Sequence, residues 1–133
     1  MDKKHIYLDY AAATIVDKKV LDAFNEANNK YFANPNSNNK LGHISKNIID
    51  ETTNQVAQLL DVKPSEIIYT SGSTESNNLA IKGFCERYKT FGKHILISSL
   101  EHTSVIASCT RLTEQGFEVE IIPVDKQGKT DIN

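Results

Sequence analysis

Apolar positions recur at helical spacing through the first half of the chain. From Val20 to Phe32 they predict an amphipathic helix, with Asp17 as a plausible N-cap. A second pattern predicts a helix over residues 43–60 that ends before Pro64. The stretch 25–39 contains seven asparagines, and it predicts a loop because Asn favours turns over regular structure.

The pattern changes after Pro64 to short apolar runs separated by helical stretches. The expected strands are 67–69, 95–97 and 119–124, and the expected helices are 74–89 and 103–115. This alternation predicts an α/β fold with a parallel or mixed sheet and crossover helices. Right-handed crossovers bring the ends of the first two strands, and the helix starts that follow them, to one edge of the sheet, where ligands bind in such folds.

Composition narrows the class of protein. The chain has 133 residues, 39% of them hydrophobic and 24% charged, with a formal charge of −2, as expected of a globular domain. It has no basic stripe for nucleic acid and no apolar run long enough to cross a membrane. Cys85 and Cys109 are too far apart in sequence for a zinc motif, and the first residues do not resemble a secretory signal. We therefore expect a cytoplasmic protein with reduced thiols.

The junction from Thr70 to Glu75, Thr-Ser-Gly-Ser-Thr-Glu, is the first candidate for chemistry. Its small residues let a ligand approach the backbone, and the N–H groups of a helix start favour an anion. The hydroxyls of Ser71, Ser73 and Thr74 add donors. The junction is neither a Walker loop nor a GxGxxG motif. A hydroxyl-rich helix cap without a ligand is the alternative explanation.

His102 is the second candidate. It follows Glu101 just after the second expected strand, which places it at the same sheet edge as the junction. A histidine there can stack on a planar cofactor or transfer a proton. Alone it is more often a surface or hydrogen-bonded residue. His5, His43 and His94 have no comparable setting.

Several segments together resemble the class V aminotransferase family and, within it, the cysteine desulfurases. The matching segments are residues 7–14 (YLDYAAAT), 34–37 (NPNS) with Gly42, 70–78 (TSGSTESNN) and 101–105 (EHTSV). The resemblance implies the fold of type I pyridoxal-phosphate enzymes, with a large α/β domain, a smaller domain and a homodimer. Residues 1–63 then supply an N-terminal segment and two helices, and residues 64–133 begin the large domain, which this chain leaves incomplete.

The resemblance also implies roles for individual residues. Ser73 and Thr74 are similar to the positions that bind the phosphate of pyridoxal 5'-phosphate. His102 is similar to the catalytic histidine that stacks on the cofactor ring and assists proton transfer. Residues 34–37 are expected near the mouth of the site. The family converts L-cysteine to alanine and passes the sulfur as a persulfide to a protein cysteine, for an acceptor or scaffold protein that supplies iron–sulfur clusters or thio-cofactors.

The sequence departs from the family pattern in two ways. Asn39 stands where many members have a histidine. In the family, the Schiff-base lysine, the aspartate on the pyridine nitrogen and the persulfide cysteine lie beyond the segment matched here, and Cys85 and Cys109 align with non-catalytic helix positions. We therefore expect an N-terminal portion that is inactive by itself. Alternatives are another class V aminotransferase, a selenocysteine lyase, or a non-catalytic anion-binding or dimerisation module.

Overall fold

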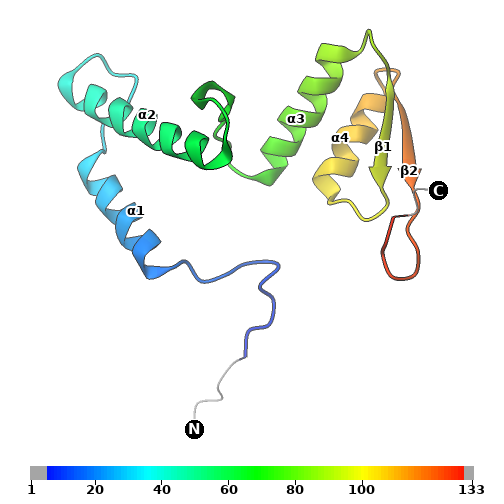
Figure 1. Ribbon diagram of the computed structural model, residues 1–133, viewed down its shortest axis with the longest axis horizontal. Coiled ribbons are helices and arrows are strands. Elements are labelled where there is room, and N and C mark those ends of the chain that lie inside the picture. Colours follow the sequence, from blue (N-terminus) through cyan, green and yellow to red (C-terminus); the bar gives the residue numbers. More distant parts are fainter. Residues whose placement is uncertain (1–5, 131–133) are drawn as a thin grey trace. The chain divides into compact units, whose positions relative to one another are not determined.

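A computed structural model describes residues 6–130 of the chain, so His5 lies outside the described residues. The chain divides into two compact units, residues 1–67 and residues 68–133. Figure 1 labels their elements. The first unit contains α1 (Lys18–Lys30), α2 (Lys40–Leu60) and the 3₁₀ helix η1 (Pro64–Glu66), and the second contains α3 (Ser73–Tyr88), β1 (His94–Ser98), α4 (Thr103–Thr113) and β2 (Glu118–Ile122).

Helix α1 begins and ends at local signals. Asp17 is its N-cap, as the sequence predicts, and its side chain accepts a hydrogen bond from the Lys19 N–H at 2.8 Å. The helix continues to Lys30, so over residues 25–30, where the two predictions overlap, the helical apolar pattern is confirmed and the predicted loop is wrong. Asn has only a weak preference against helices, and the Asn28 side chain donates to the Phe24 carbonyl without interrupting the helix.

Helix α2 starts three residues before its predicted first residue, because Asn39 provides an N-cap. The Asn39 side chain accepts from the Gly42 N–H at 3.0 Å. The helix ends at Leu60, before Pro64 as predicted, and Asp61 takes the left-handed conformation with φ 54°.

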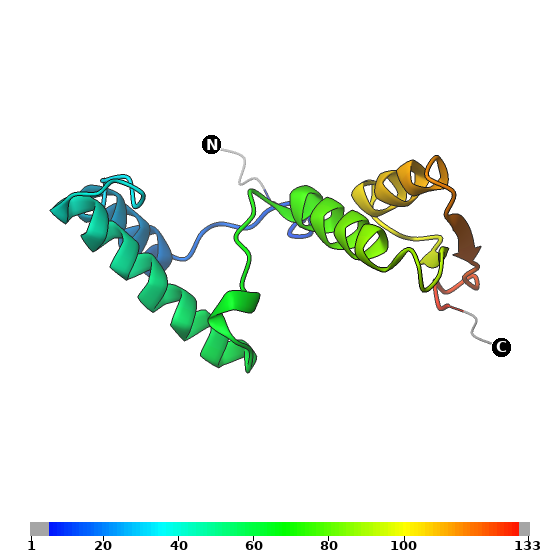
Figure 2. The same cartoon turned by 90° about the horizontal axis from the view of Figure 1, so that it is seen from above.

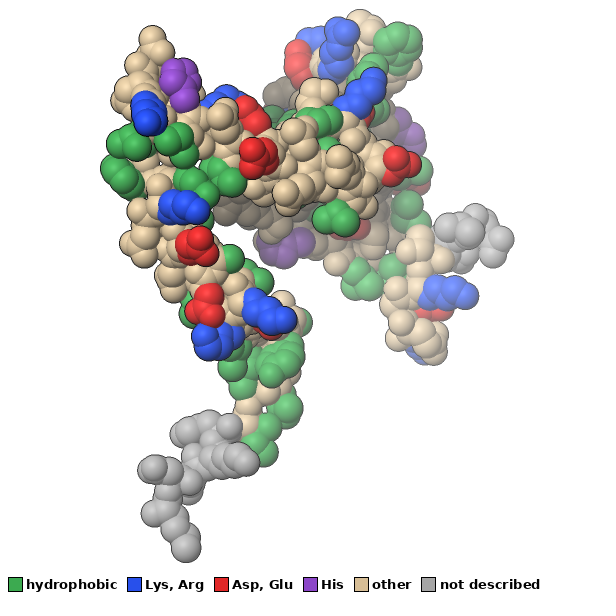
Figure 3. All heavy atoms as spheres, turned by 60° about the vertical axis from the view of Figure 1, so that its left-hand side comes forward, with side chains coloured by type: hydrophobic (Ala, Val, Ile, Leu, Met, Phe, Trp, Pro, Cys, Tyr) green, Lys and Arg blue, Asp and Glu red, His purple; other side chains and the backbone are tan. Residues whose placement is uncertain are grey.

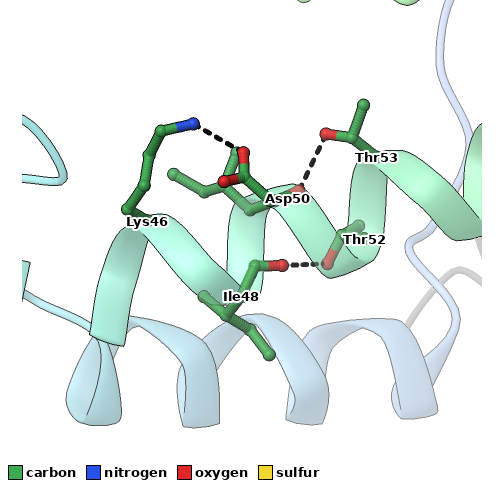
Figure 4. Close-up of polar contacts among 6 residues, drawn as sticks. Lys46, Ile48, Asp50, Thr52 and Thr53 are labelled. Atoms are coloured by element: carbon green, nitrogen blue, oxygen red, sulfur yellow. Dashed lines mark hydrogen bonds and ion pairs between the residues drawn. The ribbon is translucent and has the colours of Figure 1, made fainter. Parts of the chain in front are cut away.

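Polar side chains along the middle of α2 are satisfied within the helix itself (Figure 4). Lys46 pairs with Asp50 at 2.6 Å, and the Thr52 hydroxyl donates to the Ile48 carbonyl at 2.7 Å. Thr53 donates to the Ile49 carbonyl in the same way. The Lys46–Asp50 pair stabilises the helix slightly, and the two threonine bonds satisfy their hydroxyls on carbonyls of the same helix.

The second unit confirms the α/β class with a parallel sheet. Strands β1 and β2 pair in parallel, with Ile97 opposite Ile121, and α4 is the crossover between them (Figure 2). Helix α4 packs against both α3 and β2. Its Cys109 and Leu112 are buried, together with Phe117 that follows the helix. These side chains form the core of this unit.

Two of the predicted strand assignments differ from the structure. Residues 67–69 have no strand assignment within the described chain, although the backbone of Ile67 is extended, so the sheet has two strands and not three. A segment becomes a strand only when a neighbouring segment forms backbone hydrogen bonds along its length, and an apolar run in the sequence does not show whether such a neighbour exists. Strand β2 ends at Ile122, and Val124 forms an isolated antiparallel bridge with Thr130.

Few apolar side chains are buried within the described residues, and many large ones reach the surface (Figure 3). Phe24 of α1 is 63% exposed and Leu59 of α2 is 86% exposed. On the sheet, Leu96 and Ile121 are 57% and 59% exposed. The small core accounts for only part of the apolar pattern in the sequence. None of the helices in residues 6–130 has the length and hydropathy needed to span a membrane.

Candidate functional site

The turn before α3 is held in place by its own side chains. The carboxylate of Glu75 accepts hydrogen bonds from both the N–H and the hydroxyl of Ser71, each at 2.7 Å. These two bonds lower the pKa of Glu75, the backbone bond contributing most. The hydroxyls of Thr70 and Ser76 bond to each other at 2.7 Å. The turn is therefore ordered before any ligand arrives.

The first residues of α3 keep their donors free. Gly72 is the N-cap and has no side chain to satisfy the helix start. Across residues 6–130, no hydrogen-bond partner is found for the hydroxyl or N–H of Ser73 or Thr74, and both residues are exposed. A Cβ built at Gly72 meets nothing within 4 Å. Free N–H groups, two hydroxyls and the positive end of the helix dipole suit an oxyanion such as phosphate.

The single carboxylate in the first turn of α3 does not occupy these donors. Glu75 bonds to Ser71, which precedes the N-cap, and leaves Ser73 and Thr74 open. An incoming anion would therefore not have to displace this side chain. The donor set fits a phosphate group.

His102 caps the second helix of the candidate site. It is the N-cap of α4, and its Nδ1 accepts from the Ser104 N–H at 3.1 Å. The same nitrogen lies 2.8 Å from the Ser104 hydroxyl oxygen. The residue is exposed, and Nε2 has no partner in the described part of the chain. One ring nitrogen is thus held and the other is available.

A hydrogen bond between helices brings the two candidates together. Asn77 of α3 donates from Nδ2 to the Ser104 hydroxyl at 2.8 Å. Because Asn77 lies about one turn after Thr74, and Ser104 lies two residues after His102, the starts of α3 and α4 lie side by side (Figures 1 and 2). The edge arrangement expected from the sequence therefore holds for these helix starts, although the first expected strand is absent.

Sequence reasoning missed Asn77 and Ser104. The available signal was weak: two short polar residues at positions of α3 and α4 that face one another. Ser104 is 6% exposed and Ser108, which donates to its carbonyl at 2.8 Å, is fully buried. Buried hydroxyls with partners indicate a built polar contact between the helices.

The two thiols lie in a setting that disfavours reactivity. Burial raises the pKa of Cys85 in α3. Burial also raises the pKa of Cys109 in α4, and the nearby Cys85 and Glu101 raise it further. A raised pKa keeps the thiol protonated and therefore a poor nucleophile. Within residues 6–130, no group of three or more His, Cys, Asp or Glu side chains could hold a metal ion.

The segment 34–37 belongs to the first unit and packs on α2. Its Asn34 carbonyl accepts from the Ser37 N–H at 3.0 Å, and a Cβ on Gly42 would lie 2.3 Å from the Ser37 carbonyl oxygen. Asn39, the departure from the family pattern, is the N-cap of α2. Its side chain thus has a local structural use, and the position of 34–37 near a site mouth stays a prediction.

Comparison with known proteins gives consistent matches. Residues 6–133 match the family described as Aminotransferase class-V. "Cysteine desulfurase IscS 1" of Archaeoglobus fulgidus is 43% identical over 126 residues, which are 95% of this chain and 33% of that protein. "Cysteine desulfurase, mitochondrial" of Arabidopsis thaliana is 40% identical, covering 96% of this chain and 28% of that protein. The chain therefore spans about a third of the length of the curated relatives it matches.

Solved structures agree with these relatives. A protein titled "NIFS-LIKE PROTEIN" superposes with a TM-score of 0.87 at 32% identity, covering 96% of this chain and 35% of that one. A structure titled "SspA in complex with cysteine" gives a TM-score of 0.77 at 38% identity, covering 88% of this chain and 34% of that one.

Proposed function

The chain belongs to the class V aminotransferase family, and on that premise we propose that it is the phosphate-binding part of a pyridoxal 5'-phosphate-dependent cysteine desulfurase. One observation carries the proposal: the free donors of Ser73 and Thr74 lie at a helix start beside the helix that His102 caps. A hydroxyl-rich cap without a ligand explains the free donors but not the neighbouring histidine with a free Nε2.

Each residue has a distinct task in this proposal. The N–H groups and hydroxyls of Ser73 and Thr74 hold the phosphate, and charge-assisted bonds of this kind are the stronger ones. The imidazole of His102 packs on the cofactor ring, and its Nε2 gives or takes a proton. The bound cofactor supplies an electron sink, which allows the C–S bond of cysteine to break. The protein's contribution is to bind and orient.

The proposed overall conversion is L-cysteine plus a protein thiol to alanine plus a protein persulfide. The support is that relatives at 40–43% identity carry the name cysteine desulfurase and that a structurally similar protein was solved with cysteine. This favours a cysteine desulfurase over a selenocysteine lyase or another aminotransferase. We further propose a cytoplasmic homodimer that delivers sulfur to an acceptor or scaffold protein for iron–sulfur cluster assembly.

Equilibrium dialysis of the purified protein against pyridoxal 5'-phosphate tests the binding role. Thr74→Ala removes one hydrogen bond to a charged group, worth about 1.5 to 3 kcal/mol, so the affinity should fall about tenfold or more. Ser73→Ala should act in the same direction. Thr90→Ala, the same change just past the far end of α3, is the matched control and should bind like the wild type.

Pyridoxal without its phosphate provides a second control. It should bind much more weakly than pyridoxal 5'-phosphate, because the free donors of Ser73 and Thr74 then lack their anion. Equal binding of the two compounds, or unchanged affinity in both alanine variants, would show that the α3 start does not hold the phosphate.

Alanine formation from cysteine tests the catalytic assignment. The chain has no Ser-x-His-Lys segment, the motif that carries the family's covalent lysine, so the purified chain with added cofactor should form no alanine. Sustained alanine production by the chain alone would refute the proposal that its contribution is limited to binding and orientation.

A further inference from the structure

The hydrogen bonds from Asn77 through Ser104 to His102 run in one direction. The Ser104 N–H donates to His102 Nδ1, so this nitrogen carries no proton. The Ser104 hydroxyl, 2.8 Å from the same nitrogen, must then donate its single proton there. That leaves the hydroxyl oxygen as an acceptor, and Asn77 Nδ2 donates to it at 2.8 Å. Every donor in the sequence of bonds has an acceptor.

The direction of these bonds determines the state of the imidazole. With Nδ1 accepting two hydrogen bonds, the neutral ring carries its proton on Nε2. The bonds also hold the ring plane, because both donors belong to one buried residue whose carbonyl is bonded by the buried Ser108. The solvent-facing nitrogen is therefore presented as a donor in a fixed orientation.

We propose that Asn77 and Ser104 are positioning residues that set the tautomer and orientation of His102. The inference rests on the proposed function, because it assigns His102 Nε2–H as the group offered to cofactor and substrate. A helix cap alone would need only the Ser104 N–H. Asn77 comes from a different helix, 27 residues earlier in the chain, and adds nothing to the cap itself. Its bond to Ser104 fixes which way the hydroxyl points.

The ¹⁵N signals of the His102 imidazole in the full chain, free of cofactor and at a pH where the ring is neutral, report the tautomer. They are assigned by their loss in His102→Gln. The wild type should show mainly the Nε2–H form. Asn77→Asp keeps the size but supplies only acceptors, so the Ser104 proton turns toward the carboxylate. The ratio of Nε2–H to Nδ1–H should then fall about two- to tenfold, the worth of one hydrogen bond.

Asn78→Asp is the matched control. It adds the same charge one residue further along α3. The wild-type Asn78 side chain donates to the Thr74 carbonyl and accepts from Lys82, and it forms no bond to Ser104. It should leave the tautomer ratio at the wild-type value. Ser104→Ala is a second route in case Asn77→Asp disturbs the packing of α3 on α4. It should also lower the ratio, and Ser104→Thr, which restores a hydroxyl, should recover it while circular dichroism shows unchanged helix content.

Two results would overturn the proposal. One is a wild-type tautomer ratio in both folded Asn77→Asp and folded Ser104→Ala. The other is an equal fall in Asn77→Asp and Asn78→Asp. Dialysis against pyridoxal 5'-phosphate distinguishes failure of the positioning role from failure of the proposed function. A chain with the Nε2–H tautomer that binds no cofactor refutes the function alone, and a chain that binds cofactor but shows either overturning result refutes the positioning role alone.

Discussion

Gly42 offers a sharp test of the first unit, because two opposing effects can be compared there. It lies in the first turn of α2 and is buried against residues 34–37. A Cβ would lie 2.3 Å from the Ser37 carbonyl oxygen and 2.8 Å from the Asn34 carbonyl oxygen. Both oxygens already accept a backbone hydrogen bond that a shift would weaken: the Ser37 N–H donates to the Asn34 carbonyl, and the Asn39 N–H donates to the Ser37 carbonyl at 2.9 Å.

Helix propensity alone favours Gly42→Ala by up to about 1 kcal/mol. Overpacking against a fixed backbone costs about 1 to 3 kcal/mol and sometimes more. A contact of 2.3 Å belongs at the upper end of that range, so we expect a net loss of about 1 to 2 kcal/mol in the free energy of unfolding. Gly83→Ala in α3 is the control, because a Cβ there meets nothing within 4 Å. It should stabilise by about 0.5 to 1 kcal/mol.

Urea unfolding followed by far-ultraviolet circular dichroism measures both variants. The midpoint should fall for Gly42→Ala and rise for Gly83→Ala, with slopes equal to that of the wild type. If Gly42→Ala unfolds at the wild-type midpoint or above it, the close packing of residues 34–37 on α2 is refuted. If both variants move down together, the loss cannot be ascribed to a clash at Gly42.

Three further changes test local features. Asn39→Ala removes the N-cap of α2 and should cost about 0.5 to 2 kcal/mol in urea unfolding, whereas Asn38→Ala should cost little. The pKa of Glu75 is lowered in the folded chain, so its hydrogen bonds to Ser71 contribute their full stability above the ordinary glutamate pKa of about 4.3. This stability is lost as the pH falls through the lower pKa of the folded state. A Glu75→Gln variant should lack this acid dependence of helix content, and an identical acid profile would contradict the assignment. Cys109 is buried and Cys85 is half-buried, so Cys109 should react with a thiol reagent at pH 8 more slowly than Cys85, and both should react more slowly than free cysteine. Reaction rates of the two single-cysteine variants measure this. Faster reaction of Cys109 than of Cys85 would contradict its burial.

Helices with local signals were predictable from the sequence. The cap at Asp17 and the stop before Pro64 depend on residues within one turn, and both are confirmed. The errors came where local preference is weak or where a partner decides. Asn at 25–30 favours turns only slightly, and an existing helix includes such residues at little cost. Residues 67–69 have the composition of a strand, but a strand also needs a hydrogen-bonded neighbour, which composition does not specify.

The residues of the candidate site also fall into two groups: those that the local sequence indicates, and those whose role depends on a distant partner. Ser73, Thr74 and His102 could be singled out because each lies at a helix start, where the type of residue already indicates free donors or an available imidazole. Asn77 and Ser104 could not, since their importance arises only when two helices pack and bring side chains 27 residues apart to 2.8 Å. The groups offered to a ligand are thus determined by the local sequence, whereas the orientation of His102 depends on a tertiary contact. A variant that loosens the packing of α3 on α4 should therefore alter the histidine before it alters the phosphate donors, which belong to a turn that Ser71 and Glu75 hold by themselves.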